Sequence, residues 1–474
     1  MIRSSGSEAS QHHAKASPGG GQETLRSLRR SLADFAGSSP PRTALLIFTL
    51  TIAVFTALLS MPWATAGPGS PTFYDALFVA TSAVSVTGLT PVNTAEHWSL
   101  GGQIVILVGI QIGGLGILSV ASLLAVSVTR GLGLRTRLIA QEGMTTGRLG
   151  EVGSLLRTVV VCSVVVEAAL AAVLIPRMIA IEGSVSDGVW HGVFYAVSAF
   201  NNAGFLIHPG GLADLGNDPL VLWVLMIGVF LGSLGFPVLL MLYRCRTRIR
   251  QWGLHTRITM EVSLVMLVLG TIMYGFLEWG NSQTLGGLPF WESLQNSLFS
   301  SVMMRSGGFS VVDTAAERPE TMLVTSALMF VGGGSASTAG GIKVTTFAVI
   351  LLAVVAEARG HQDLTIHGRR IASSTLRVAI AVVALAATLV LISTLALTTI
   401  AEEDVARPLF ESISAFATTG LSTGLTEELP PSGLYILAGL MFAGRVGIMT
   451  FAAALALRQR TQRLRLPESR PVIG

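Results

Sequence analysis

Long apolar stretches dominate this chain and restrict it to a membrane. Eight of them reach about 20 residues or more, the length at which a helix crosses a hydrocarbon core about 30 Å thick. They lie near 44–63, 100–128, 155–181, 219–243, 258–278, 321–356, 373–400 and 432–457. Only 12% of the 474 residues are charged, which is about half of the usual share in soluble domains. We therefore predict an all-α integral membrane protein.

The loops between these stretches alternate in charge, which predicts an orientation. Arginines gather in alternate loops and in the C-terminal tail, namely at Arg130, Arg135, Arg137, Arg148, Arg244, Arg246, Arg248, Arg250, Arg257, Arg359, Arg369, Arg370, Arg377, Arg458, Arg460, Arg463, Arg465 and Arg470. The opposite loops hold Arg318 and Arg407 but are otherwise acidic or neutral. Because basic loops stay on the cytoplasmic side, we expect both termini in the cytoplasm and the chain in a bacterial inner membrane. This topology explains the net charge of +4 without a nucleic-acid partner.

Four short segments of the chain match one another. They read SAVSVTGL at 82–89, SAFNNAGF at 198–205, SSVMMRSGGF at 300–309 and SAFATTGL at 414–421. Each contains a glycine followed by Leu or Phe, at Gly88, Gly204, Gly308 and Gly420. A short amphipathic run with an aromatic residue precedes each segment, and these runs are too short to span a membrane. The pattern indicates half-helices that enter the membrane and stop midway.

The repeated glycine points to a pore. Non-helical backbone at membrane depth is tolerated only where it is buried in protein or lines a water-filled cavity. Glycine permits positive φ and a close approach of backbone to ligand, so four such loops could surround a dehydrated monovalent cation with carbonyl oxygens. We predict four repeats of helix, re-entrant pore loop and helix around a pseudo-fourfold central pore. The expected divisions are a disordered cytoplasmic tail without a signal peptide at 1–41, repeats at 42–128, 152–246, 255–357 and 371–458, and a second cytoplasmic tail at 459–474.

Further motifs resemble those of the Trk, Ktr and HKT superfamily of cation transporters over most of residues 42–457. They read QIGGLGIL at 111–118, GSLGFPV at 232–238, GGGSASTAGGIKV at 332–344 and GRVGIMTF at 444–451. The resemblance implies a filter of backbone carbonyls, contributed with the four glycines by Val86, Thr87, Asn202, Ala203, Ser306, Gly307, Thr418 and Thr419. Glycine in all four loops is similar to the potassium-selective members, so the implied substrate is K⁺, with Na⁺ left open. Ser306 and Gly307 depart from the Thr and Ala that the family pattern suggests.

The number of spans is similar to the KtrB-type pore subunit rather than to longer family members. Such subunits work as homodimers on a cytoplasmic ring that binds nucleotide. This sequence contains no phosphate-binding GxGxxG after a strand, so a nucleotide sensor of the KtrA or TrkA kind would be a separate polypeptide. The resemblance therefore implies membrane lipid, a second copy of the chain and that ring as partners, and no bound cofactor.

The stretch at 321–356 is too long for one straight crossing, and its centre predicts a gate. Glycine costs a helix about 1 kcal/mol, so a glycine-rich centre suits a break and a loop that moves. The expected gate comprises Gly332, Gly333, Gly334, Ser335, Ala336, Ser337, Thr338, Ala339, Gly340 and Gly341, with Lys343 and Arg445. The alternative is close helix packing by small residues. Lys343 is equally compatible with a place among lipid headgroups.

Charged residues inside spans are costly and need a partner or a function. Arg445 is expected to face the pore or a partner, where contact with the glycine loop could latch it shut. Glu167 is either a proton or sodium site or a partner for a donor on a neighbouring helix. Arg305, beside the third loop, is expected to brace its pore helix by bonding carbonyls or a carboxylate.

Two rival functions need consideration. A sodium-permeable or ion-coupled transporter of the same fold is not separable by sequence, nor is a channel from a carrier. A membrane enzyme would need clustered His, Asp or Glu at catalytic spacing. The histidines instead lie in the N-terminal tail and in different loops, at His12, His13, His97, His191, His208, His255, His361 and His367. The two cysteines, Cys162 and Cys245, are expected to be apolar fillers. We therefore predict neither an enzyme nor a transition-metal site.

Overall fold

The computed structural model describes residues 40–67, 71–131, 151–215, 218–246, 248–361 and 363–447. Both predicted tails, most of the arginine-rich 130–148 segment and the end of the last expected span lie outside these ranges. Almost all regular structure in the described ranges is helical. The strands β1 (Thr365–Ile366) and β2 (Arg369–Arg370) form a small antiparallel hairpin.

Four units of helix, short helix and helix follow one another along the chain. The first comprises α2 (Pro40–Leu59), α3 (Phe73–Ser85) and α5 (Leu100–Gly131). The second comprises α7 (Glu151–Glu182), α8 (Val185–Asn201), α9 (Pro219–Leu234) and α10 (Phe236–Cys245). The third comprises α11 (Leu254–Glu278), α12 (Phe290–Met303), α13 (Pro319–Phe330) and α14 (Val344–Ala358). The fourth comprises α15 (Ser373–Ala401), α16 (Ala406–Ala417) and α18 (Pro431–Phe442), which continues as a π-helix at Ala443–Gly447.

Short elements join these helices. They are the helices α4 (Thr94–His97) and α17 (Leu425–Glu428), and the 3₁₀ turns η1 (Pro62–Ala64), η2 (Gly211–Leu215), η3 (Ile249–Gln251) and η4 (Thr314–Ala316).

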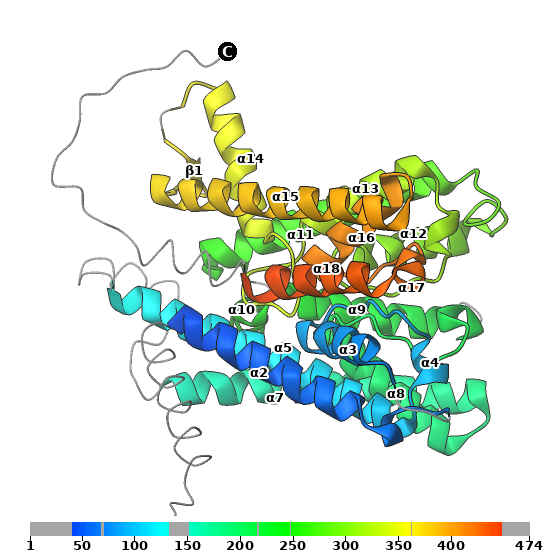
Figure 1. Ribbon diagram of the computed structural model, residues 1–474. Helices are drawn as coiled ribbons and strands as arrows, with labels where there is room; N and C mark the ends of the chain where they lie inside the picture. Colours follow the sequence, from blue (N-terminus) through cyan, green and yellow to red (C-terminus); the bar gives the residue numbers. More distant parts are fainter. Residues whose placement is uncertain are drawn as a thin grey trace, which may run out of the picture.

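The units close into a ring. Within the first, second and fourth units, the short helix packs against both of the helices that flank it, as α3 does on α2 and α5. Between units, the helix after each short helix packs against the short helix of the next unit, in the pairs α5 with α8, α9 with α12, α13 with α16 and α18 with α3. The last pair joins the fourth unit to the first, which Figure 1 draws in orange-red and blue. The predicted four repeats around a pseudo-fourfold axis are therefore confirmed.

Three described helices are long and apolar enough to cross a membrane, namely Arg157–Glu182, Leu254–Glu278 and Ser373–Ala401. Their outward faces expose apolar side chains such as Val165, Val265 and Leu391, each at least 60% exposed. Apolar surface of this kind is matched by lipid rather than by water. The chain is a membrane protein.

Two of the expected spans are broken. The stretch at 321–356 breaks between α13 and α14, as its glycine content predicts. The stretch at 219–243 was expected to be one helix, but α9 and α10 meet at Gly235 at an angle of 101°. Gly235 has φ 91°, and a Cβ at this position would lie under 3.0 Å from the carbonyl oxygen of Ser335. The break therefore makes room for the loop between α13 and α14.

Candidate functional site: a ring of four glycine loops

Three of the four short helices end in the same turn. Val86, Asn202 and Thr418 directly follow α3, α8 and α16 and adopt the left-handed conformation, with φ between 48° and 60°. The next backbone N–H then reaches back to a helix carbonyl, from Thr87 to Ser82 at 2.8 Å, from Ala203 to Ser198 at 2.8 Å and from Thr419 to Ser414 at 2.9 Å. This pairing caps a helix while turning the chain sharply away from its axis.

The first and fourth loops share a further contact. The Ser82 hydroxyl accepts the N–H of Gly88 at 3.0 Å, and the Ser414 hydroxyl accepts that of Gly420 at 3.2 Å. A serine six residues before the glycine therefore fixes the loop against its own helix.

The third loop is built differently. Its short helix α12 ends at Met303, and the next residue, Met304, keeps right-handed geometry. The carbonyl of Met303 accepts the N–H groups of Ser306, Gly307 and Gly308 at 3.2, 2.8 and 3.3 Å. Ser306 and Gly307 are also the two residues at which the superfamily resemblance predicted Thr and Ala instead. The third loop therefore differs from the other three in sequence and in backbone conformation at the same residues.

The four glycines interlock in a closed cycle. All have positive φ, and a Cβ on any one would lie under 3.0 Å from a carbonyl oxygen of the following loop. Those contacts run from Gly88 to Ala203, from Gly204 to Gly307, from Gly308 to Thr419 and from Gly420 back to Thr87. Because backbone cannot move aside as easily as a side chain can, a Cβ at any of these positions would force the neighbouring loop to shift. The structure thus brings all twelve predicted filter residues into one ring.

The ring has the electrostatic character of a cation site. The C-terminal ends of α3, α8, α12 and α16 meet there, and the C-terminus of a helix carries a partial negative charge. Two polar side chains of the ring are engaged by its surroundings. The hydroxyl of Thr87 lies 2.7 Å from that of Ser85, and the amide oxygen of Asn202 accepts from Thr338 at 3.0 Å. The backbone carbonyls of Thr87, Ala203, Gly307 and Thr419 lie at the contacts between successive loops.

Buried polar groups brace the second and third short helices. Glu167 on α7 accepts from Ser163 at 2.6 Å, from Gln111 on α5 at 3.1 Å and from Asn201 at the end of α8 at 3.1 Å. Of the two interpretations of Glu167, the structure thus provides the pairing with donors on neighbouring helices. The predicted brace by Arg305 is present, because its guanidinium donates to the Ser263 carbonyl of α11 at 2.9 Å.

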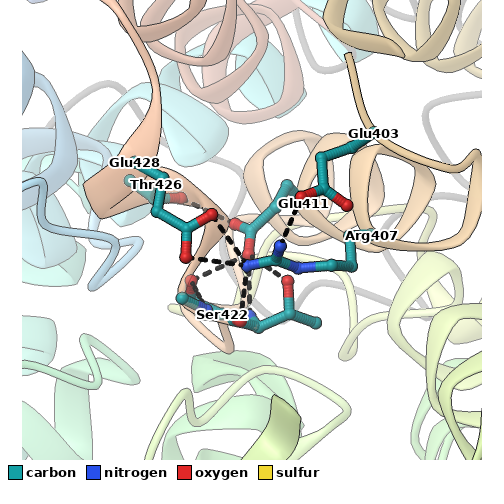
Figure 2. Close-up of polar contacts among 8 residues, drawn as sticks. Glu403, Arg407, Glu411, Ser422, Thr426 and Glu428 are labelled. Atoms are coloured by element: carbon teal, nitrogen blue, oxygen red, sulfur yellow. Dashed lines mark hydrogen bonds and ion pairs between the residues drawn. The ribbon is translucent and has the colours of Figure 1, made fainter. Parts of the chain in front are cut away.

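A third brace holds the last loop (Figure 2). The fully buried Glu411 carboxylate on α16 accepts from the hydroxyls of Ser422 and Thr426, each at 2.7 Å, and from the Thr423 N–H at 2.8 Å. Arg407 donates to the Thr423 carbonyl at 3.3 Å and forms ion pairs with Glu403 and Glu428 at 2.9 and 3.1 Å. The peptide groups of Thr423 are thus held from both sides.

The pKa of a carboxyl group beyond the third loop is strongly raised. Glu317 accepts a hydrogen bond from the Tyr274 hydroxyl at 3.0 Å and is 9% exposed. Burial raises the pKa of Glu317 to about 8, and the nearby Glu278 and Asp313 also raise it. At neutral pH this carboxyl is therefore mostly protonated.

The predicted gate residues form a folded loop between α13 and α14. The loop is closed by N–H groups of Gly332 and Val344, which donate to Ile342 and Gly333 at 3.0 Å each. It is also tied to the break between α9 and α10, where Gly334 donates to Ser233 at 2.8 Å.

The gate loop also contacts the ring. Thr338 bonds the Asn202 side chain of the second filter loop, and a Cβ on Gly340 would meet the Ala417 carbonyl and Thr418 of the fourth. The two positively charged side chains predicted for the gate both donate hydrogen bonds to carbonyls of this loop. Arg445 donates to Thr338, and Lys343 donates to Ala339 at 2.6 Å. Arg445 is 3% exposed, so its charge is enclosed beside the loop.

Comparison with known proteins identifies the family. Residues 42–462 match the TrkH family, which is described as cation transport protein. The chain belongs to the TrkH family. Among similar proteins, Ktr system potassium uptake protein B of Bacillus subtilis is 36% identical over 92% of this chain and 97% of the relative. Potassium/sodium uptake protein NtpJ of Enterococcus hirae is 35% identical over 85% and 89%.

The fold agrees with that membership. The crystal structure of the potassium transporter TrkH from Vibrio parahaemolyticus superposes with a TM-score of 0.69, covering 86% of this chain and 83% of that one at 15% identity. Sequence reasoning missed two features around the ring of this chain, the break at Gly235 and the brace at Glu411. Pro237 directly after the break was a local signal for the first. Glu411 lies in the short amphipathic run that precedes the fourth segment, but nothing local identifies its partners.

Proposed function

We propose that this TrkH-family chain mediates potassium uptake across the inner membrane of a bacterium. The observation that carries the proposal is the closed cycle of glycine and carbonyl contacts among four loops. Relatives over 30% identical along most of the chain are named potassium uptake proteins. Carbonyl oxygens of the twelve ring residues take the place of the water shell of K⁺, and the four helix C-termini stabilise its charge.

The gate proposal concerns the loop at 332–341. In the present conformation Arg445 and Lys343 bind carbonyls of that loop. A fixed positive charge near the axis raises the barrier to cations, so these contacts suit a closed or resting gate. Opening requires Arg445 to release Thr338, which frees the glycine-rich backbone to move.

Sodium permeation is the second candidate, because the Enterococcus hirae relative is named for both ions. The substrate assay below separates the two.

The remaining proposals concern assembly. We expect a homodimer that works with a cytoplasmic nucleotide-binding ring, as the resemblance to the KtrB-type subunit implies. That ring would be a separate polypeptide, since the sequence lacks a phosphate-binding GxGxxG after a strand. The arginine pattern supports an orientation with both termini in the cytoplasm.

The test is rubidium uptake into proteoliposomes with potassium or sodium as competitor. Wild type should be blocked by potassium far better than by sodium, and Gly88→Ser should lose that discrimination. Gly424→Ser is the matched control, because Gly424 also has positive φ but has no neighbour within 4 Å of its Cβ position. Thermal unfolding in potassium, sodium or choline gives a readout that needs no partner. Equal protection by potassium and sodium would refute the substrate assignment.

A further inference from the structure

Three potential metal ligands meet at the start of the second pore helix. Glu182 is the last residue of α7, His191 lies on α8, and His208 follows the second filter loop. We propose that these three side chains bind one zinc ion. This site goes beyond the proposed transport function, and it corrects the expectation that the histidines lie apart.

The ligand atoms already lie at suitable distances. Glu182 Oε1 is 2.8 Å from His191 Nδ1 and 3.3 Å from His208 Nε2, and all three atoms lie within 4.8 Å of one another. Ligands around one tetrahedral zinc, with bonds of about 2.0–2.1 Å, are about 3.3 Å apart. An ion can therefore enter with only small side-chain movements.

The surroundings orient His208 for this role. Its Nδ1 lies 2.6 Å from the Tyr195 hydroxyl, and the two rings stack with centroids 5.5 Å apart. The same hydroxyl accepts the N–H of Ile207 at 3.3 Å. When Nδ1–H donates to Tyr195, the lone pair of His208 is on Nε2, the nitrogen that faces Glu182. Metal-binding histidines are commonly held in this way by a group on the other ring nitrogen.

The Glu182 carboxylate can accept a further ligand or hydrogen bond. Both imidazoles contact Oε1 of Glu182, whereas its Oε2 is buried and has no hydrogen-bond partner in the described part of the chain. A buried carboxylate oxygen without a donor costs free energy, which a bound cation would recover. The side chains of Glu182, His191 and His208 are 14%, 19% and 10% exposed, so the cluster is recessed but open to solvent.

The ligand types select the metal. Two imidazole nitrogens and one carboxylate match the His₂Glu set that binds zinc and leaves a fourth position for water. Calcium and magnesium prefer sites built from oxygen ligands. We therefore expect zinc to bind and magnesium not to compete.

Zinc here would act on the filter. His208 is four residues beyond Gly204, and the ion would tie that segment to the turn between α7 and α8. Transport inhibition by zinc rests on the proposed function, whereas zinc binding does not.

Calorimetric titration with zinc chloride decides the site. The protein is the full-length, tag-free chain with His12→Ala and His13→Ala throughout, because adjacent histidines bind zinc on their own. We expect one zinc per chain, and an affinity loss of at least about tenfold in Glu182→Gln, His191→Ala and Tyr195→Phe. His97→Ala, outside the cluster, should bind as the parent does. Equal binding by parent and Glu182→Gln would overturn the proposal.

Thermal unfolding of the same proteins shows whether the variants are folded and whether zinc stabilises them. Zinc should raise the melting temperature of the parent and of His97→Ala, but not that of Glu182→Gln, and magnesium should raise none of them. Rubidium uptake with zinc added outside the proteoliposomes then tests the effect on transport. Inhibition in the parent, relieved in His191→Ala, supports control of the filter. Zinc binding without inhibition refutes that control while leaving the metal site established.

Discussion

The Glu411 carboxylate should hold the fourth filter loop mainly through hydrogen bonds rather than through charge. Replacement by Ala leaves the Thr423 N–H and the hydroxyls of Ser422 and Thr426 without their acceptor (Figure 2). The hydroxyls can rotate to other acceptors, but the amide cannot. An unsatisfied buried donor costs about 1–3 kcal/mol, and the one lost methylene costs about 0.8 kcal/mol. We expect Glu411→Ala to lose about 2–4 kcal/mol of unfolding free energy.

Glu411→Gln is the matched variant. Its amide oxygen can replace Oε1, which accepts from Ser422 and from the N–H of Thr423. Its NH₂ group then faces Thr426, whose hydroxyl can turn to accept instead of donate. The loss should stay below about 1 kcal/mol.

Equilibrium unfolding in mixed micelles measures both variants, and rubidium uptake with sodium competition reports the filter. Selectivity should fall in Glu411→Ala and persist in Glu411→Gln. Equal damage by the two substitutions would show that the charge itself, facing Arg407, is what holds the loop.

Three further predictions follow from other parts of the site. Gly420→Ala and Gly424→Ala both place alanine at positive φ, a strain of about 1–2 kcal/mol, but only the alanine at position 420 overlaps a neighbouring carbonyl. Rubidium-over-sodium selectivity should therefore fall about tenfold or more in Gly420→Ala alone. Equal loss of selectivity in both variants would refute the interlocked ring. Arg445→Gln removes the charged donor to Thr338, so rubidium efflux from loaded proteoliposomes should rise, and an unchanged leak would contradict the latch. Glu317 has its pKa raised from 4.5 to about 8, so the folded state holds its proton more tightly and stability should fall as pH rises from about 4.5 to 8 and then level. Glu317→Gln should flatten that part of the melting-temperature profile, and an identical profile would disprove the assignment.

The sequence predicted features that reside in a single residue type. Gly88 and its three counterparts could be found because the backbone conformation itself demands glycine. The break at 331–343 was visible because glycine lowers helix stability wherever it accumulates. The bend at Gly235 was missed despite Pro237 nearby, since hydropathy stays high when both halves of a broken helix remain among apolar neighbours.

Features built from distant residues were beyond sequence reasoning. His191 and His208 lie 17 positions apart on different elements, and only the fold of α8 back onto its own filter loop brings them to Glu182. The partners of Glu411 likewise depend on how the chain returns after Gly420. The order in which the four loops abut one another is a property of packing, and no motif specifies it.

The contact between α18 and α3 sets an order of events during biosynthesis. The first pore helix leaves the ribosome early, but the helix that completes its packing is almost the last part of the membrane domain to be made. At ordinary rates of translation the interval is roughly tens of seconds. During that time α3 must be sheltered by its own unit or by the insertion machinery. A nascent chain that stops before residue 431 would therefore contain all four loops but lack α18, the helix that joins the fourth unit to α3, and its ring would stay open.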